Sequence, residues 1–320
     1  MNICIYAKNI VPLQSEIKLA YCGLMTIAIF GNAMKTDTLI EVRHILQFMT
    51  EKGIHVLLSQ ELRQELNLRE YPSFPDVTVN GESLDVNGET VDFALSVGGD
   101  GTFLTSAAAI GDKNIPILGI NCGHLGFLAE VQSQDVDDIL HKLVAGEYTI
   151  EQRSMLALSV FDKENNKRDG LIMAPNALNE IAILKEGLSS MLQIELKVNG
   201  EYLHTYNSDG LVIATPTGST AYNLSIGGPL MAPQSRGIIL TPIAPHSLTV
   251  KPLVVPDDWK FDIRVTSRYD AFMASVDGRS QSLSTDLSLH VERAPYTVKV
   301  VQIGDNSFLK SLRTKLNWGK

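Results

Sequence analysis

The pattern of apolar residues changes once along this chain, near residue 148, and this change restricts the fold more than any other feature. Between Met25 and Glu147, short apolar runs alternate with segments of helical periodicity, which is typical of a parallel sheet covered by helices. From Tyr148 onward, short apolar runs joined by turn residues predominate. The sequence therefore predicts an N-terminal Rossmann-like α/β domain followed by an all-β, β-sandwich-like C-terminal domain.

The first part of the chain contains the pattern of several strands and helices. The expected strands are residues 26–30, 55–59, 91–97 and 115–120, and the expected helices are residues 36–52, 102–110 and 135–145. Gly53 and Gly146 stand directly after two of these helices, where helices commonly end. Residues 71–90 hold two prolines and two Asn-Gly pairs, which indicates an irregular connection or a hairpin.

The second part is expected to consist mainly of strands. These strands are residues 155–161, 179–184, 192–198, 210–215, 237–243, 260–267, 271–276, 287–293 and 296–303. Asn199-Gly200 predicts a tight hairpin turn. A helix is expected over residues 307–318, with an apolar face made of Phe308, Leu309, Leu312 and Leu316.

These patterns divide the chain into four segments. We expect a leader over residues 1–24 that adds little to the fold, an α/β domain over 25–147, a β-rich domain over 148–298 and a C-terminal segment over 299–320. An alternative makes the start of the chain a secretion signal, with Lys8 and Lys18 as its charged flank and Gly31–Ala33 as the cleavage site.

Composition excludes several classes of function. The chain has 320 residues, 44% of them hydrophobic, and a formal net charge of −9, so it lacks the general positive field that binds nucleic acids or anionic membranes. The apolar stretch Leu19–Phe30 is too short to span a bilayer. Cys4, Cys22 and Cys122 show neither disulfide pairing nor metal-ligand spacing. We therefore expect a cytoplasmic protein without a nucleic-acid or membrane partner.

The segment Ser96–Leu104, SVGGDGTFL, joins a buried strand to a helix through a glycine-rich turn. At this edge of an α/β sheet, glycine N–H groups and the helix N-terminus together favour an anion such as phosphate. An aspartate repels phosphate unless it handles a proton or a magnesium ion, so Asp100 indicates phosphoryl-transfer chemistry. The alternative is that Asp100 only caps the helix that begins near Thr102.

Two further stretches carry polar groups that fit a nucleotide. Residues 208–231 place Thr217, Ser219 and Thr220 around a sharp turn, although a hydroxyl-rich loop that caps a helix is the alternative explanation. Asn179 and Glu180 form an amide–carboxylate pair that can bind sugar hydroxyls, and solvation of an edge strand would also explain them. The common motifs for P-loops, dinucleotide folds, zinc proteases and serine hydrolases are absent.

From Met25 onward the sequence resembles the NAD kinase family, because five motifs occur in that family's order. They are GGDGTFL (98–104), GINCGHLGFLAE (119–130), NE (179–180), SDGLVIATPTGSTAYNLSIGGP (208–229) and LTPIAPHSL (240–248). The resemblance implies phosphorylation of NAD to NADP, with NAD between two domains and a C-terminal segment that packs back on the first domain. It also implies a homo-oligomer, dimer or tetramer, whose copies complete the sites.

The resemblance also implies roles for individual residues. Asp100 would accept the proton of the adenosine 2′-hydroxyl as that oxygen attacks the γ-phosphorus of the donor. The phosphate-binding residues would be Gly98, Gly99, Gly101 and Thr102. The NAD-binding residues would be Asp100, Gly101, Phe127, Asn179, Glu180, Asn207, Asp209, Thr217, Thr220, Ala221, Tyr222, Asn223 and Ser225.

Within that set, the matched motifs suggest which part of the dinucleotide each residue meets. Asn179 and Glu180 match a ribose-binding pair, and Asp209 matches an acid near the nicotinamide. Phe127 matches an aromatic that lies against adenine, with simple core packing as its alternative. Asn207 stands where family members differ and where preference between NAD and NADH is set. Arg279 occupies a position where many relatives have glutamine.

The implied substrates are NAD and ATP, with inorganic polyphosphate as an alternative donor. Mg²⁺ would be carried with ATP, and no side chain is assigned as its ligand. Two other functions stay open from the residues alone. One is a non-catalytic dinucleotide sensor on the same fold, and the other is a lipid or sugar kinase that shares the GGDG loop.

Overall fold

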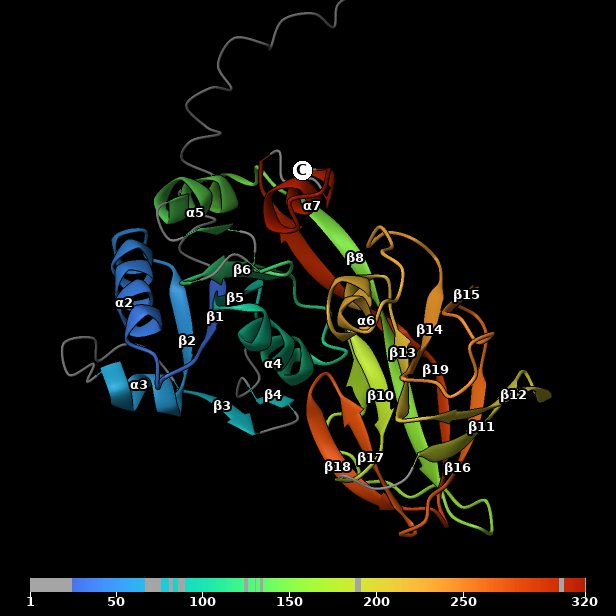
Figure 1. Ribbon diagram of the computed structural model, residues 1–320. Coiled ribbons are helices and arrows are strands. Elements are labelled where there is room, and N and C mark those ends of the chain that lie inside the picture. The colour runs from blue at the N-terminus through green and yellow to red at the C-terminus, as the bar shows by residue number, and fades with distance from the viewer. Residues whose placement is uncertain are drawn as a thin grey trace, which may run out of the picture.

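The structure is a computed structural model that describes residues 25–66, 76–80, 83–85, 90–123, 126–129, 131–132, 135–187, 191–304 and 308–319. The predicted leader, residues 1–24, lies outside the described residues. Figure 1 shows a helix-covered domain beside a larger domain built mainly of strands. The predicted combination of an α/β domain and a β-rich domain is therefore confirmed.

The N-terminal domain is built on a parallel sheet. Its strands follow the order β6 (Ile117–Asn121), β5 (Phe93–Gly98), β1 (Thr26–Gly31), β2 (His55–Ser59) and β3 (Asp76–Asn80). The short strand β4 (Ser83–Asp85) pairs antiparallel with β3, so the predicted irregular segment contains a hairpin. Because the chain leaves β1 toward β2 and later returns to its other side as β5, the strand order reverses between β1 and β5.

Helices cover both faces of this sheet. They are α2 (Thr36–Glu51), α3 (Gln60–Leu66), α4 (Asp100–Ile110) and α5 (Val136–Ala145). Along β1, Ile27 and Ile29 join the core shared with α2 and α5, whereas Ala28 and Phe30 join the core shared with α4. This alternation follows from the two-residue period of a strand, and it explains why β1 is apolar throughout. The secretion-signal alternative is wrong for this fold, because cleavage after Ala33 would remove β1, a central strand.

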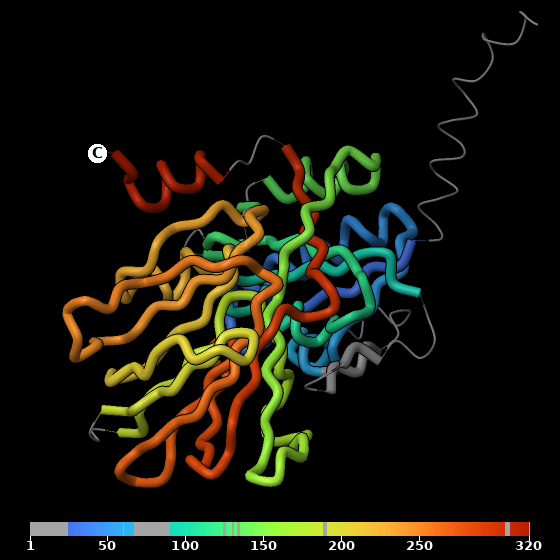
Figure 2. The backbone as a smooth tube through the Cα atoms, turned by 90° about the vertical axis from the view of Figure 1, so that its right-hand side faces the viewer, coloured from blue at the N-terminus to red at the C-terminus, as the bar shows by residue number. Residues whose placement is uncertain are grey.

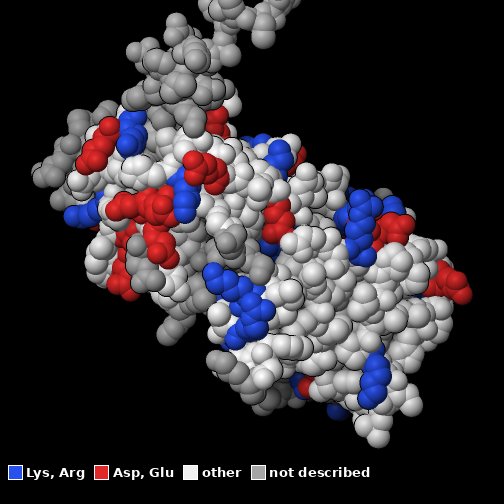
Figure 3. Space-filling view, turned by 90° about the horizontal axis from the view of Figure 1, so that it is seen from above, with Lys and Arg blue, Asp and Glu red and all other residues white. Residues whose placement is uncertain are grey.

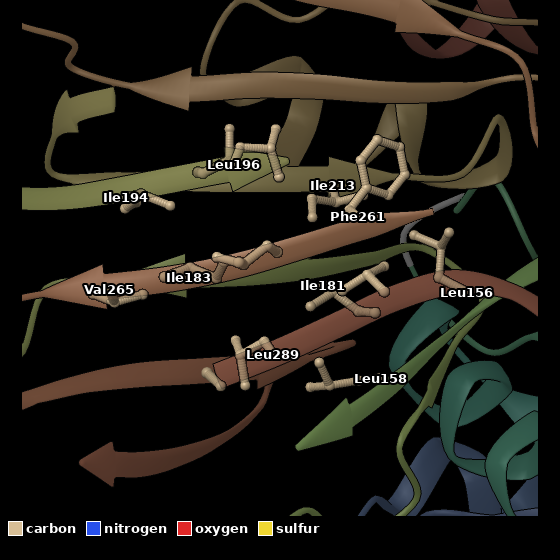
Figure 4. Close-up of a cluster of buried hydrophobic side chains, with 14 of the residues drawn as sticks. Leu156, Leu158, Ile181, Ile183, Ile194, Leu196, Ile213, Phe261, Val265 and Leu289 are labelled. Carbon is tan, nitrogen blue, oxygen red and sulfur yellow. The ribbon is translucent and has the colours of Figure 1, made fainter. Parts of the chain in front are cut away.

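The C-terminal domain packs two sheets against each other. One has the order β15 (Leu253–Val255), β14 (Ile238–Ile243), β13 (Gly210–Ala214), β10 (Glu180–Leu184), β17 (Ala271–Val276) and β18 (Arg279–Ser284). The other includes β12 (Glu201–Ser208), β11 (Leu192–Val198), β16 (Phe261–Thr266), β19 (Ser288–Gln302) and β8 (Thr149–Phe161). Figure 4 shows Ile181 and Ile213 of the first sheet facing the same core as Phe261 and Leu289 of the second.

Strand β19 joins the two domains, and it corrects one prediction. The sequence pattern suggested separate strands at 287–293 and 296–303, but Ser288–Gln302 is one strand paired with β8, with a register shift between Arg293 and Thr297. Pro295 stands at this shift, where a residue without an N–H is tolerated. Val300 pairs with Ile117 of β6, so β19 belongs to the sheets of both domains, and the proposed boundary at 298/299 falls inside it.

The C-terminal helix α7 (Phe308–Lys315) follows β19 and is shorter than the predicted helix over 307–318. Figure 2 shows it at the upper end of the molecule, beyond the end of β19. Its buried residues are Ser311 and Leu312, while Leu309 is 62% exposed, so the apolar face is narrower than the sequence suggested.

In the view from above (Figure 3), the described residues carry both basic and acidic side chains on the surface. Figure 3 shows lysine and arginine side chains in separate patches on that face, with acidic side chains between some of them. Within the described part of the chain, no helix combines the length and the apolar character needed to cross a bilayer.

Candidate active site

Asp100 is held by the backbone of a neighbouring loop. Its Oδ2 accepts a hydrogen bond from the Phe127 N–H at 2.8 Å, and its Oδ1 accepts bonds from the N–H groups of Leu128 at 2.9 Å and Ala129 at 3.1 Å. The residue in the N-cap position of α4 is Gly99, and no side chain caps that helix terminus. The alternative that Asp100 is only a helix cap is therefore wrong.

Two glycines permit this arrangement. A Cβ atom on Gly126 would collide with the Asp100 carboxylate, so only glycine lets the loop approach so closely. Gly98 ends β5 with a φ of +153°, and a Cβ there would collide with the side chain of Thr102. Close packing on Asp100 thus depends on Gly126 of the neighbouring loop, whereas Gly98 of the predicted turn allows the close approach of Thr102.

A cavity of about 590 Å³ lies where the strand order reverses, and we name it the switch-point cavity. It is lined by Gly31, Asn32, Ala33, Met34, Lys35, Glu61, Gln64, Glu65, Gly99, Gly101, Thr102 and Thr105. The loops after β1 and β5 form much of its wall, and the N-terminus of α4 adds free N–H groups and a partial positive charge. This is the position at which open α/β sheets bind ligands, and the helix N-terminus and Lys35 favour phosphate there, while Glu61 and Glu65 add negative charge to the wall.

A second cavity of about 390 Å³ lies between the domains, and we name it the crevice cavity. It is lined by Phe127, Thr149, Ile150, Glu151, Arg153, Thr217, Thr220, Pro233, Gln234, Gln302, Gly304 and Phe308. The predicted residues Phe127, Thr217 and Thr220 therefore share one cavity, although they come from different domains. Its combination of aromatic, aliphatic and polar side chains suits a heterocyclic base.

Asp100 lies next to both cavities through its neighbours, although it lines neither of them. Its chain neighbours Gly99 and Gly101 line the switch-point cavity, and Phe127, whose N–H it accepts, lines the crevice cavity. A carboxylate in this position can serve a group bound on either side. A carboxylate near both cavities can accept the proton of a nucleophile bound in one cavity while that nucleophile attacks an electrophile bound in the other.

The other two predicted motifs meet at the end of β13. There the chain forms a 3-10 helix η2 (Thr217–Thr220) and the short helix α6 (Tyr222–Ser225). The Thr215 N–H donates to the Asn179 carbonyl at 2.9 Å, and a Cβ on Gly218 would collide with the Asn179 backbone. The backbone N–H of Tyr222 donates to the Glu180 carboxylate. Asn179 and Glu180 therefore lie directly against the long hydroxyl-rich motif.

Glu180 is buried in an unusual state. Glu180 is only 8% exposed, and its Oε2 atom has no hydrogen-bond partner among the described residues. Burial, followed by the negative charge of Asp277, raises the pKa of Glu180 to about 7, and the Tyr222 N–H acts in the opposite direction. A buried carboxylate oxygen without a donor is costly, and a ligand hydroxyl would relieve that cost.

The remaining residues of the long motif differ in their surroundings. Tyr222 and Ser225 are exposed, and Ala221 is partly buried. Asn223 is fully buried, and its amide bonds the carbonyls of Ser219 and Pro229 and accepts from the Thr241 hydroxyl. The Asn223 side chain therefore stabilises the loop, and a contact of Asn223 with NAD stays a prediction.

Asn207 and Asp209 lie far from the other predicted site residues of the same chain. Asp209 precedes the start of β13 and pairs with Lys185 at 2.8 Å, whereas η2 follows the end of β13. A strand of this length separates its ends by about 14 Å. The Asn207 carbonyl accepts the His246 N–H at the same far end. Both residues lie away from the Glu180 end of the paired strands.

The sequence patterns did not predict two groups of polar side chains that lie at the crevice cavity. Arg153 is 5% exposed, donates to Glu151 at 2.8 Å and to the Thr217 hydroxyl at 3.5 Å, and the Gln302 amide also donates to Glu151. From α7, Lys315 donates to the Gly126 carbonyl and places its ammonium 4.6 Å from the centre of the Phe127 ring. The alternation of Glu151 and Arg153 on one strand face was the available signal, but the expected strand began only at residue 155.

The fold and the two cavities are those of a protein that binds nucleotides at the carboxyl edge of a parallel sheet. A family model described as the ATP-NAD kinase N-terminal domain matches residues 27–148, and the ATP-NAD kinase C-terminal domain matches residues 178–303. The chain therefore belongs to the NAD kinase family.

This chain matches relatives named NAD kinase over nearly their full length. The chain is 42% identical to an NAD kinase of Bacteroides fragilis over 92% of this chain and 98% of that protein. It is 37% identical to an NAD kinase of Flavobacterium johnsoniae over 92% of this chain and 99% of that protein.

Solved structures give the same fold. A yeast NADH kinase complexed with NADH superposes with a TM-score of 0.79 at 23% identity, covering 93% of this chain and 89% of that one. An NAD kinase from Archaeoglobus fulgidus in complex with ATP gives a TM-score of 0.68 at 25% identity, covering 92% of this chain and 99% of that one.

Proposed function

We propose that this chain is an ATP-dependent NAD kinase that transfers the γ-phosphoryl group of ATP to the 2′-hydroxyl of the adenosine ribose of NAD. The products are NADP and ADP. The observation that carries this proposal is the position of Asp100 next to the switch-point cavity and the crevice cavity, in a chain that belongs to the NAD kinase family.

The donor binds in the switch-point cavity. N–H groups around Gly99, Gly101 and Thr102 meet the phosphates, and Lys35 on the cavity wall adds a positive charge. The described residues include no cluster of three or more His, Cys, Asp or Glu side chains suited to a metal ion. The donor substrate in this proposal is MgATP, in which Mg²⁺ keeps phosphate and water oxygens as its main ligands.

The acceptor binds in the crevice cavity. Adenine lies against Phe127 near the hydroxyls of Thr217 and Thr220, which line this cavity. The ribose hydroxyls donate to Asn179 and Glu180, which do not line the cavity but lie against the segment that carries these two threonines. The partnerless Oε2 of Glu180 supports this placement, because a buried acceptor is satisfied only when a donor arrives.

Asp100 acts as the proton acceptor. A carboxylate offers about four lone-pair sites, and three N–H groups already occupy three of them. The remaining site accepts the 2′-hydroxyl proton while the ribose oxygen forms its bond to the γ-phosphorus and the bond to the ADP oxygen breaks. General-base help of this kind contributes about 10²–10⁴ in rate.

A second copy of the chain completes the site. Asn207 and Asp209 lie at the far end of β13, so they reach the nicotinamide end of a dinucleotide bound to another copy in a dimer or tetramer. Strand β12, which carries Asn207, is the edge of its sheet and exposes Tyr202 and Leu203. An exposed apolar edge of this kind suits association with a second copy. We also place the enzyme in the cytoplasm.

The direct experiment incubates the purified full chain with NAD, ATP and Mg²⁺ and measures NADP by a coupled, NADP-specific reaction. The proposal expects turnover that requires both substrates. Well-folded protein that binds NAD without forming NADP would support a dinucleotide sensor instead. Replacing ATP by polyphosphate and NAD by NADH then defines the donor and the acceptor.

A further inference from the structure

The turn between β17 and β18 fastens the segment that carries Asn179 and Glu180. The Asp277 carboxylate accepts hydrogen bonds from the N–H groups of Leu178 at 2.8 Å, Asn179 at 2.8 Å and Glu180 at 3.1 Å. The Asp277 N–H in turn donates to the Glu180 carbonyl at 3.1 Å. Four hydrogen bonds therefore connect this one residue to three consecutive residues of another segment.

These bonds are needed because Leu178 and Asn179 lie between two strands. Strand β9 (Asn176–Ala177) ends before them and β10 begins after them, so the sheet ladders do not use their N–H groups. Leu178 is fully buried and Asn179 is 7% exposed. A buried N–H without an acceptor is destabilising, and a carboxylate is a strong acceptor for it.

Arg279 extends the same attachment. Its guanidinium donates to the carbonyls of Ala174 at 3.3 Å and Asn176 at 3.4 Å. Asp277 and Gly278 have φ values of +47° and +80°, which is the tight turn of a two-residue hairpin. The turn thus presents a carboxylate and a guanidinium side by side to the chain that precedes β10.

We propose that Asp277 is a positioning residue that holds Asn179 and Glu180 where they receive the ribose hydroxyls of the acceptor, acting through their backbone without touching the ligand. The inference rests on the proposed function, in which Asn179 and Glu180 bind that ribose. It goes beyond it by assigning the placement of both side chains to a residue from a different hairpin.

The charges around the turn give the proposal a distinctive readout. The charge of Asp277 adds to burial in raising the pKa of Glu180. Burial also raises the pKa of Asp277, while its three N–H donors and Arg279 oppose that effect. Tyr296 is the other titratable group on which Asp277 and Arg279 act, and burial raises its pKa. Removing the charge of Asp277 should therefore lower the pKa of Glu180.

The test is the variant Asp277→Asn in the full-length enzyme. One amide NH₂ would then face N–H groups that need an acceptor, so we expect KM for NAD to rise about 10-fold while KM for ATP changes less than about twofold. The acid limb of kcat/KM for NAD should also move to lower pH. The control is Asp286→Asn. The side chain of Asp286 is 64% exposed and pairs with Lys163, so this variant should change neither the KM values nor the acid limb.

If Asp277→Asn does not fold, Arg279→Ala replaces it, because this variant keeps the carboxylate and has no side-chain donor for the carbonyls of Ala174 and Asn176. We then expect a rise of about threefold in KM for NAD alone. A folded variant with unchanged KM and an unmoved acid limb overturns the inference. Equal losses for NAD and ATP without a pH shift, the sign of a general structural role, also overturn it.

Glu180→Ala, measured in parallel, separates this inference from the proposed function. If Glu180→Ala raises KM for NAD while Asp277→Asn does not, the positioning role fails and the ribose assignment stands. If Glu180→Ala leaves KM for NAD unchanged, the ribose assignment fails and the positioning role fails with it.

Discussion

The N–H of Phe127 donates to the carboxylate of Asp100 at 2.8 Å, which connects a wall of the crevice cavity to the first residue of α4. One side chain thereby fixes the position of the start of α4 relative to a loop that lies 27 residues further along the chain. The proposed proton acceptor and the proposed surface for adenine are consequently positioned together, and a change in either should affect the other.

Gly126→Ala should impair the enzyme through Asp100. The new Cβ would collide with the carboxylate, so either the loop or Asp100 must move, and we expect kcat to fall at least about 10-fold because a small displacement of a catalytic group is costly. The control is Gly123→Ala, whose Cβ would meet no atom within 4 Å. Steady-state kinetics of both variants checks this, and equal activity of the two would contradict it.

Activity should depend on the ionisation of Glu180. In the proposed site the ribose hydroxyls donate to the charged carboxylate, whose pKa is about 7, so kcat/KM for NAD should rise as pH increases through about 7. Glu180→Gln should lower kcat/KM and remove this part of the profile. A pH series from 5.5 to about 8.5 tests it, and a variant that keeps the same acid limb would assign the limb to another group.

The same raised pKa should appear in the stability of the protein. Between the ordinary pKa of 4.5 and about 7, the folded chain keeps a proton on Glu180 that the unfolded chain has released, so the free energy of unfolding should fall as pH rises. The loss amounts to about 3 kcal/mol at most. Urea unfolding at both ends of this range should show a smaller loss for Glu180→Gln, and an identical slope would contradict the assignment.

Lys315 should support NAD binding from the C-terminal helix. Its ammonium lies against the Phe127 ring and bonds the Gly126 carbonyl, so Lys315→Met should raise KM for NAD about 3-fold to 10-fold. Lys315→Arg keeps the charge, so its KM for NAD should stay within about twofold of the wild-type value. Arg313→Met, at an exposed position of α7, serves as the control. If Arg313→Met and Lys315→Met change KM for NAD equally, Lys315 does not support NAD binding.

If copies complete each other's sites, and if Asp100→Asn and Asp209→Ala are each inactive alone, mixing the two variants should restore activity. Asp100→Asn removes the proton acceptor and Asp209→Ala removes the acid offered by the partner, so a mixed dimer contains one site with both residues intact. Random exchange of subunits should recover about a quarter of the original activity. The measurement is NADP formation after joint refolding, and recovery of none would mean that Asp209 serves its own chain or no site.

Local patterns in the sequence predicted most elements because strand and helix periods depend on neighbouring residues. Contacts between distant segments could not be predicted in this way. Asp277 and Asn179 are 98 residues apart, and nothing in either motif indicates that they meet. Pro295 looked like the end of a strand because its missing N–H breaks the pattern, yet pairing with β8 resumes beyond it. The far position of Asp209 likewise depends on strand register, which motif order does not reveal.

The central claim is that Asp100 accepts the proton of the attacking hydroxyl, and Asp100→Asn tests it most directly. Asparagine keeps an oxygen that can still accept from Leu128 and Ala129, so the variant should fold and bind NAD with a dissociation constant within about 10-fold of the unchanged chain. With saturating NAD and MgATP, we predict that kcat falls about 10²–10⁴-fold. A variant that binds both substrates and turns over within about threefold of the original rate would contradict the account.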